Sequence, residues 1–163
     1  MFSLEMLRQA EILLQQLRAR NLTLTTVESC TGGLLSALLT EIPGSSDVFS
    51  HGYITYANAA KQSMVGVDEA LLKTYGAVSE EVARAMAEGA LKTSGADISV
   101  AITGIAGPGG ATAGKPVGLV HIASARNGFS TFHVAQQFSG DRVTVRSQAV
   151  IASLELLQQQ LSR

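Results

Sequence analysis

The chain has 163 residues, of which 46% are hydrophobic and 15% charged, and its formal net charge is −1. A chain of this length fits one domain that buries roughly 70% of its unfolded surface, and its composition excludes extensive disorder. The near-zero charge gives no electrostatic signature of nucleic-acid binding, and the single cysteine excludes an internal disulfide and a cysteine-based zinc cluster.

The amino-terminal segment, residues 1–20, is predicted to be an amphipathic helix, because its leucines recur at roughly helical spacing between glutamines and arginines. Glu5 and Arg8 leave no room for a signal-peptide core, and no apolar run approaches the ~20 residues of a membrane span. We therefore expect a cytoplasmic protein with no membrane or nucleic-acid partner.

A strand, a helix, a loop and a second strand are predicted next. Residues 22–27 alternate apolar and β-branched polar side chains, as strands do, and a buried helix is expected over residues 32–41. Residues 42–47 have the composition of a loop, and residues 48–56 indicate the second strand.

Ser29 lies on the turn between the first strand and its helix, beside the free N–H groups and the positive end of the helix dipole. Gly32 and Gly33 allow another group to approach the backbone there. Ser29 is therefore either a nucleophile whose oxyanion is held by N–H groups near Cys30 to Gly33, with Thr31 and Gly32 at the substrate, or, like Thr31, simply a cap of the helix.

Three helices follow, each beginning at a residue that favours helix starts. The first is predicted to run to residue 65 with Asn58 as its N-cap, the second over residues 69–74 with Asp68 as its cap, and the third from Ser79 to about residue 93. Residues 97–103 form a near-continuous apolar strand, which is typical of a sheet covered on both faces.

The last part of the chain begins with a glycine-rich loop over residues 104–116. Two strands over residues 117–125 and 131–136 flank Asn127-Gly128, a strong hairpin signal that makes this pair antiparallel. Ser139 or Asp141 then caps a final helix that runs to about residue 161.

This order of elements predicts an α/β protein with three α/β/α layers around a mixed, mostly parallel sheet, as a single domain over residues 1–163. Ligands collect at the carboxyl ends of parallel strands in such sheets. Ser29 and Thr103 both lie at strand ends, so their loops are expected to face each other across one crevice.

A nucleophilic serine needs a base, and Lys61 is the candidate. The histidines at 51, 121 and 133 are scattered through strands and are expected to be structural. If Asn58 caps its helix, Lys61 takes the third position, where the dipole and burial both favour a neutral amine. Neutrality at pH 7 needs a pKa drop of roughly 3 units, about 4 kcal/mol. The alternative is an exposed surface lysine.

Three neighbours of these residues have open roles. Tyr56 could bridge Ser29 and Lys61 through its hydroxyl, or simply close its strand as a half-buried aromatic. Cys30 is a rival nucleophile, but no histidine partner is evident, so a small buried side chain is the better interpretation. Glu28 is either a site residue or a structural acceptor.

Four segments together resemble the CinA C-terminal domain family, whose stand-alone members are nicotinamide-nucleotide amidases. The resemblance covers about residues 5–158 and rests on Thr26-Val27-Glu28-Ser29-Cys30-Thr31-Gly32-Gly33, Pro43-Gly44-Ser45-Ser46, Gly52-Tyr53-Ile54-Thr55-Tyr56-Ala57-Asn58-Ala59-Ala60-Lys61 and Thr103-Gly104-Ile105-Ala106-Gly107-Pro108-Gly109-Gly110. Longer members carry an additional N-terminal, metal-dependent nucleotide pyrophosphatase domain, which these residues do not include.

The resemblance implies a three-layer α/β/α fold and hydrolysis of nicotinamide mononucleotide to nicotinate mononucleotide and ammonia, in pyridine nucleotide recycling. It implies Ser29 as nucleophile, assisted by Lys61 and Tyr56, without a cofactor or a metal. It also implies that Arg142, early in the last helix, contributes to the substrate site, where an arginine beside helix N–H groups suits a phosphate. A homo-oligomer, specifically a dimer, is expected on the same ground.

Other loop residues are expected to touch the substrate. Thr103 and Gly104 either offer it a hydroxyl and N–H groups or form an empty tight turn, and Gly44 and Ser46 could close over it. Part of the glycine loop matches a phosphate-binding P-loop, but Pro116 replaces the required Ser or Thr, so an ATPase is not expected. Two further functions stay open: a nucleotide-binding regulatory module without turnover, and a serine amidase for another amide.

Overall fold

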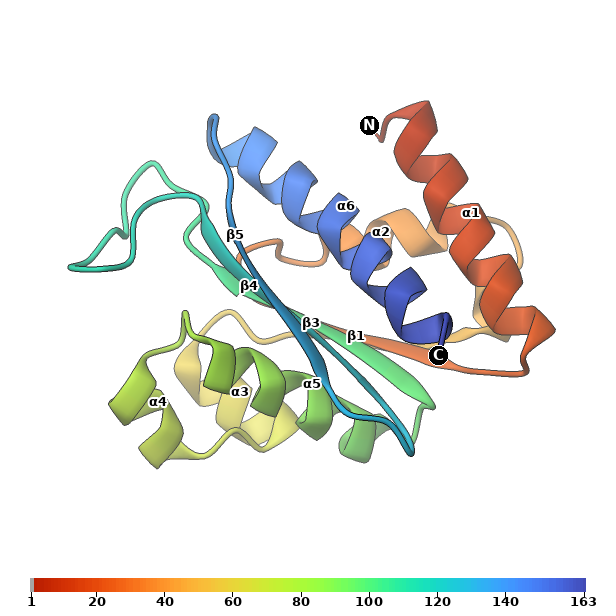
Figure 1. Ribbon diagram of the computed structural model, residues 1–163, viewed down its shortest axis with the longest axis horizontal. Coiled ribbons are helices and arrows are strands. Elements are labelled where there is room, and N and C mark those ends of the chain that lie inside the picture. The colour runs from red at the N-terminus through yellow and green to blue at the C-terminus, as the bar shows by residue number, and fades with distance from the viewer. Residues whose placement is uncertain (1) are drawn as a thin grey trace.

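The structure, a computed structural model that describes residues 2–163, has a five-stranded sheet between two layers of helices (Figure 1). The strands are β1 Leu24–Glu28, β2 Phe49–Ile54, β3 Ile98–Gly104, β4 Leu119–Arg126 and β5 Phe132–Gln137. The helices are α1 Leu4–Ala19, α2 Leu34–Thr40, α3 Asn58–Val65, α4 Glu69–Tyr75, α5 Glu80–Ser94 and α6 Arg142–Leu161, and the 3-10 helix η1 spans Ser45–Asp47.

The sheet is mixed, as predicted, with the order β2-β1-β3-β4-β5. β1 pairs in parallel with β2 and with β3, whereas β4 pairs antiparallel with β3 and with β5. β4 therefore runs opposite to the other four strands. The predicted β4–β5 hairpin is confirmed around Asn127 and Gly128, where Gly128 has a φ of +81°.

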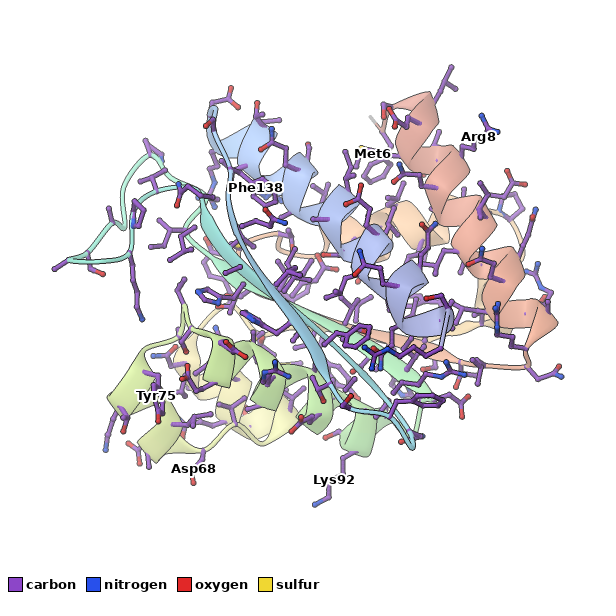
Figure 2. All side chains as sticks on the ribbon, in the orientation of Figure 1. Met6, Arg8, Asp68, Tyr75, Lys92 and Phe138 are labelled. Carbon is purple, nitrogen blue, oxygen red and sulfur yellow. The ribbon has the colours of Figure 1, made fainter. Side chains whose placement is uncertain are left out.

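Each face of the sheet is covered by three helices, so the predicted α/β/α layers are confirmed. α1, α2 and α6 pack on one face through a large leucine- and valine-rich core, and α3, α4 and α5 pack on the other (Figure 1). Met6 of α1 is buried in the first core, whereas Arg8 of the same helix is exposed (Figure 2). This alternation follows the amphipathic pattern of the segment.

Several element boundaries differ from the prediction by one to a few residues. α1 begins at Leu4 with Ser3 as its N-cap, and the prediction for Met1 lies outside the described residues. Asp141, rather than Ser139, caps α6 by accepting from Thr144 N at 2.8 Å. Asp68 and Ser79 cap α4 and α5 as expected.

The parallel half of the sheet determines which loops can meet. Because β2, β1 and β3 run in the same direction, the residues after Ile54, Glu28 and Gly104 lie at one edge of the sheet. Residues 44–47 precede β2 and lie at the opposite edge, which is its amino end. No helix within residues 2–163 is both long and apolar enough to span a membrane.

Candidate active site

A cavity of about 290 Å³ opens at the carboxyl edge of the parallel strands. Its volume is at the lower end of the range of small-molecule sites. Its walls come from the turn after β1, the start of α3, the segment before α5, the loop after β3 and the start of α6. The polar and charged side chains in the lining are Ser29, Tyr56, Asn58, Lys61, Thr103 and Arg142.

Ser29 is the first residue after β1, at the point where the chain turns into α2. Its N–H donates to Ile102 O at 2.9 Å and extends the contact between β1 and β3 by one residue. Gly32 N donates back to Ser29 O at 3.1 Å, with the φ of Gly32 at +60°, so four residues form a tight turn. Ser29 is 9% exposed and lines the cavity.

Lys61 lies beside this serine. Its Nζ atom is 3.1 Å from Ser29 Oγ and 2.7 Å from Thr55 O, and the residue is 1% exposed. Burial lowers the pKa of the amine, whereas Cys30 acts in the opposite sense. Lys61 forms no ion pair among residues 2–163. A neutral amine fits this geometry, because it can donate to Thr55 O while accepting from the serine hydroxyl.

α3 holds Lys61 in place, although the helix starts one residue earlier than predicted. Ala57, not Asn58, is the N-cap, and it makes no side-chain cap hydrogen bond. Lys61 is therefore the fourth helical residue rather than the third, and its N–H donates to Ala57 O at 3.2 Å. It still lies in the first turn, where the helix dipole disfavours an ammonium. Asn58 is free to line the cavity.

The N–H groups that could hold an oxyanion are fewer than predicted. Gly32 N is used by Ser29 O, and Gly33 N donates to Glu28 Oε2 at 3.1 Å. The N–H groups of Cys30 and Thr31 make no backbone hydrogen bond within residues 2–163. Of these two residues only Cys30 lines the cavity, so its N–H group is the available donor.

Of the two roles considered for Glu28, the structure shows that of a structural hydrogen-bond acceptor. Its carboxylate is fully buried and caps α2, whose N-cap residue Gly33 has no side chain to do so. It accepts from the N–H groups of Gly33, Leu35 and Ser36 and from the Ser36 hydroxyl at 2.7–3.1 Å. The end of β1 and the start of α2, on either side of Ser29 in the sequence, are therefore held together by hydrogen bonds to the Glu28 carboxylate.

Cys30 is buried next to the serine and is poorly suited to be a nucleophile. Burial raises the pKa of its thiol to about 11, so the thiolate is scarce at neutral pH. The hydrogen bond from its own backbone and the positive charges of Arg146 and Lys61 lower the pKa, and the charge of Glu28 raises it, without reversing the shift.

Tyr56 matches neither of the two alternatives considered for it, because it does not lie between Ser29 and Lys61 and is not half-buried. The residue is 61% exposed, and its hydroxyl accepts from Arg142 Nη2 at 3.1 Å. Arg142, the first residue of α6, also donates to Gly107 O at 2.9 Å. Both side chains line the cavity, so a cation is present at its mouth.

Thr103 and Gly104 meet Ser29 across the same cavity, as expected from their strand ends. The Thr103 hydroxyl donates to Ala77 O at 2.7 Å, and this bond ties the end of β3 to the segment before α5. A Cβ at Gly104 would lie 2.8 Å from Leu119 O, so the close pairing of β3 and β4 requires glycine there.

The remaining predicted site residues do not line the cavity. Thr31 is fully buried, and Gly32 is exposed on the turn. Gly44 and Ser46 lie at the opposite edge of the sheet, where Gly44 O accepts from Arg18 Nη2 at 2.8 Å. The expectation that these two residues close over a ligand in their own chain is therefore wrong, because parallel pairing separates the two ends of β2.

Sequence reasoning missed the parts of the site that act through backbone or across long separations. Thr55 and Gly107 contribute carbonyls, and Val78 lines the cavity from the segment before α5, so no pattern of polar side chains indicates them. Asn58 was interpreted only as a cap. Arg146 donates to Thr31 O from 115 residues away, and the sequence signal was its place one helical turn after Arg142.

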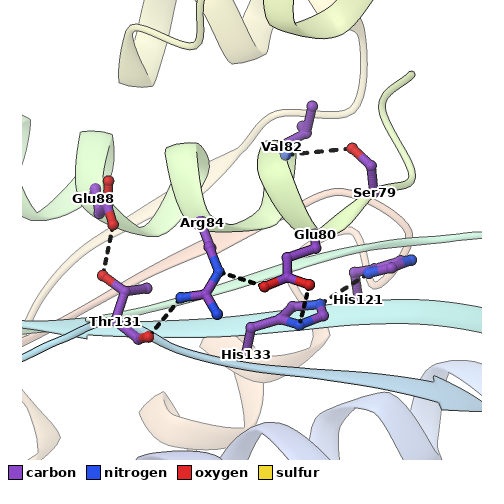
Figure 3. A network of polar contacts seen from close by, with 8 residues as sticks. All are labelled: Ser79, Glu80, Val82, Arg84, Glu88, His121, Thr131 and His133. Carbon is purple, nitrogen blue, oxygen red and sulfur yellow. Dashed lines mark hydrogen bonds and ion pairs between the residues drawn. The ribbon is translucent and has the colours of Figure 1, made fainter. Parts of the chain in front are cut away.

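Two of the three histidines form a separate network between α5 and the antiparallel strands (Figure 3). His121 Nδ1 and His133 Nε2 are 2.9 Å apart, and His133 Nδ1 is 3.4 Å from Glu80 Oε2. Neither histidine lines the cavity at Ser29. No group of three or more His, Cys, Asp or Glu within residues 2–163 is placed to hold a metal ion.

Comparison with known proteins identifies close relatives of the whole chain. The family model for the CinA C-terminal domain matches residues 7–161. A nicotinamide-nucleotide amidohydrolase PncC from Enterobacter agglomerans is 49% identical over 139 residues, which are 85% of this chain and 85% of that protein. A putative competence-damage inducible protein from Caldicellulosiruptor saccharolyticus is 50% identical over 90% of this chain, which spans only 36% of that longer protein.

Solved structures show the same architecture. The competence/damage inducible protein CihA from Agrobacterium tumefaciens superposes with a TM-score of 0.96 at 42% identity, over 100% of this chain and 99% of the other. A CinA superfamily protein from Escherichia coli superposes with a TM-score of 0.92 at 36% identity, over 98% of this chain and 94% of the other.

Proposed function

Because the chain belongs to the CinA C-terminal domain family, we propose that it is an amidohydrolase that converts nicotinamide mononucleotide to nicotinate mononucleotide and ammonia. The observation that carries the proposal is the contact between Ser29 Oγ and Lys61 Nζ at 3.1 Å on the wall of a cavity. A buried lysine without a carboxylate partner is the base that a serine without a histidine needs. The 49% identical relative is named for this activity.

The first step is attack on the carboxamide. Lys61, as a neutral amine, takes the hydroxyl proton of Ser29 while Ser29 Oγ forms a bond to the carboxamide carbon. The carbonyl π electrons move to oxygen, and the N–H group of Cys30, the residue of this turn that lines the cavity next to Ser29, holds the resulting oxyanion. The positive charge of the pyridinium ring opposes a second positive charge on Lys61, which favours the neutral amine in the substrate complex.

The second step releases ammonia and then frees the enzyme. The protonated Lys61, assisted by Tyr56, donates to the amide nitrogen as the C–N bond breaks, and an acyl ester on Ser29 remains. Lys61, neutral again, takes a proton from water as the water oxygen attacks the ester carbon. The bond from that carbon to Ser29 Oγ then breaks, Oγ takes the proton from Lys61, and nicotinate mononucleotide leaves. No metal or organic cofactor enters these steps.

Arg142 is proposed to bind the phosphate of the nucleotide. Its guanidinium lies at the mouth of the cavity, at the amino end of α6, and one of its two contacts is the Tyr56 hydroxyl. A phosphate oxygen would compete with Tyr56 for Arg142 Nη2. Substrate binding would then free the tyrosine hydroxyl for the proton transfers at Ser29 and Lys61.

The test is ammonia release from nicotinamide mononucleotide in the presence of excess chelator. We expect a chelator-resistant wild type, loss of at least about 10³-fold in the rate for Ser29→Ala, and near-normal turnover for Cys30→Ala. An active Ser29→Ala variant together with an inactive Cys30→Ala variant would show that the Cys30 thiol is the nucleophile. Chelator inhibition that is reversed by added metal would contradict the serine mechanism.

A panel of pyridine amides separates this function from its two rivals. Tight binding of nicotinamide mononucleotide without turnover would indicate a regulatory module, and turnover of a different amide would indicate a serine amidase of other specificity. A cytoplasmic homodimer that acts in pyridine nucleotide recycling completes the proposal. Light scattering on the purified chain tests the dimer.

A further inference from the structure

A side chain of α6 donates a hydrogen bond to the turn that carries Ser29. Arg146 lies one helical turn after Arg142, and its Nη2 atom donates to Thr31 O at 2.6 Å. Thr31 O belongs to the peptide whose N–H, that of Gly32, donates to Ser29 O. The guanidinium therefore bonds to the same short turn whose two central amides face no backbone partner.

The charge of this guanidinium is not neutralised locally. Arg146 is half-buried, forms no ion pair among residues 2–163, and its Nε is buried without a hydrogen-bond partner. It lies near enough to the turn that a Cβ at Gly32 would be 3.8 Å from Nη2. Its positive charge also lowers the pKa of the Cys30 thiol, so its field reaches the residue beside the nucleophile.

Packing of α6 does not explain why an arginine is present. The helix is anchored by buried side chains such as Val145, Ala149 and Val150. Two cations within its first two turns oppose the helix dipole, and a half-buried guanidinium carries a desolvation cost. An arginine that costs stability and contacts the nucleophile turn is better explained by the chemistry of that turn.

We propose that Arg146 is a positioning residue for the oxyanion-binding turn of this enzyme. It holds Thr31 O and so fixes the short turn between Ser29 and Gly32, which carries the Cys30 N–H group, and its charge favours the negative oxygen that forms there. The inference deepens the proposed amidase function, because it assigns the support of the oxyanion site. It needs only acyl transfer to Ser29, whichever amide is the natural substrate.

The experiment compares Arg146→Met, which removes donor and charge, with Arg146→Lys, which keeps a donor and the charge as a single ammonium. The matched control is Arg126→Met, because Arg126 also donates to a carbonyl, Gln160 O, but at the other edge of the sheet. Two rates are measured for the folded fraction: kcat with nicotinamide mononucleotide, and the burst of p-nitrophenolate that accompanies acylation of Ser29 by p-nitrophenyl acetate.

We expect Arg146→Met to lose about 10²-fold in both rates with KM changed less than about threefold, and Arg146→Lys to recover most of the loss. Arg126→Met should keep both rates. Unchanged rates in folded Arg146→Met, or a loss confined to thermal stability, would overturn the inference.

The two proposals fail in different ways. A wild type that reacts with p-nitrophenyl acetate but not with nicotinamide mononucleotide refutes the proposed substrate, while the burst still tests Arg146. A wild type whose Ser29 reacts with neither contradicts both, since a supported oxyanion site beside an activated serine should accept an activated ester.

Discussion

Two regions of this molecule place a titratable nitrogen in contact with a second side chain, and they differ in what surrounds the pair. Lys61 and Ser29 meet at the carboxyl edge of the parallel strands. His121 and His133 meet on the antiparallel strands, under α5 (Figure 3). Burial lowers the pKa of Lys61 and of both histidines.

The histidine pair is enclosed by countercharges and further bonds. Glu80 lies between His133 and Arg84, and Arg84 Nη1 donates to Thr131 O. Lys61, by contrast, forms no ion pair with a carboxylate among residues 2–163, and it lines an open cavity. A lowered pKa is therefore common to both regions and does not by itself mark a reactive site. What distinguishes Lys61 is its access to a cavity and the lack of a carboxylate partner that would favour its charged form.

The sharpest way to test this contrast is to replace the lysine. Lys61→Ala and Lys61→Arg should each lower kcat at least about 10³-fold while substrate binding stays largely intact, because arginine keeps its proton at any usable pH. Ammonia release gives kcat, and equilibrium dialysis gives binding. In the wild type the rate should rise with pH through an apparent pKa below the ordinary lysine value, since burial favours the neutral amine.

An active Lys61→Arg enzyme would remove the contrast, because the lysine would then act only as a positive charge. Folding is checked by the thermal unfolding curve, which matters here since removal of a fully buried side chain leaves a cavity. The arginine variant separates the loss of the base from the loss of charge.

Much of the fold was predictable because local patterns and tertiary structure agree. Residues 98–104 are apolar almost throughout and became a central strand, and Asn127-Gly128 became the expected hairpin. The prediction of Asn58 as the N-cap of α3 was wrong by one residue, since Ala57 serves as the N-cap without any side-chain hydrogen bond. Such a cap leaves no mark in the sequence.

The site was predictable where a side chain follows a strand end, as Ser29 and Thr103 do. It was not predictable where rotamers or topology decide. Tyr56 turned toward Arg142, and the chain order alone cannot tell which neighbour a half-exposed hydroxyl will contact. Gly44 and Ser46 follow the serine closely in sequence, but the parallel connection carries them to the far edge of the sheet.

A smaller effect is expected for the cation at the mouth of the cavity. Arg142→Ala should weaken binding of nicotinamide mononucleotide by about 1.5–3 kcal/mol, the range of a charge-assisted hydrogen bond, and leave binding of the unphosphorylated riboside unchanged. KM is measured for both compounds with the wild type and with Arg142→Ala. Direct binding is measured with and without Arg142→Ala in the inactive Ser29→Ala background. An equal preference in wild type and variant would show that Arg142 does not bind the phosphate.

Tyr56→Phe is the matched control for that experiment. It removes the hydroxyl that accepts from Arg142 but leaves the guanidinium in place. If the hydroxyl assists proton transfer after the phosphate has released it from Arg142, kcat should fall more with the nucleotide than with the riboside, which has no phosphate to release it. A rise in KM for the nucleotide with kcat unchanged would show that Tyr56 only holds Arg142 in place.

The smallest effect should come from the histidine network. His133→Gln removes the contact with His121, worth about 1 kcal/mol, so Tm should fall by roughly 2–4 °C near pH 7.5 while turnover stays within a factor of two. Differential scanning fluorimetry and the ammonia assay measure the two outcomes. A loss of turnover above tenfold would place the network in the catalytic machinery and erase the contrast between the regions.

The same variant should change how stability depends on pH. Burial sets the pKa of both histidines below the ordinary value, an effect that His133 and Lys115 reinforce at His121 and that Glu80 and Glu81 oppose at both rings; Arg84 adds to it at His133. The unfolded chain therefore binds more protons as pH falls through about 6.5, so wild-type stability should decline from there toward the lower folded-state pKa values. With one of the two rings absent, His133→Gln should show a shallower decline of Tm between pH 7.5 and 5.5. An equal slope in both proteins would mean that other groups carry the acid sensitivity, and the histidine pair would then be only a packing contact.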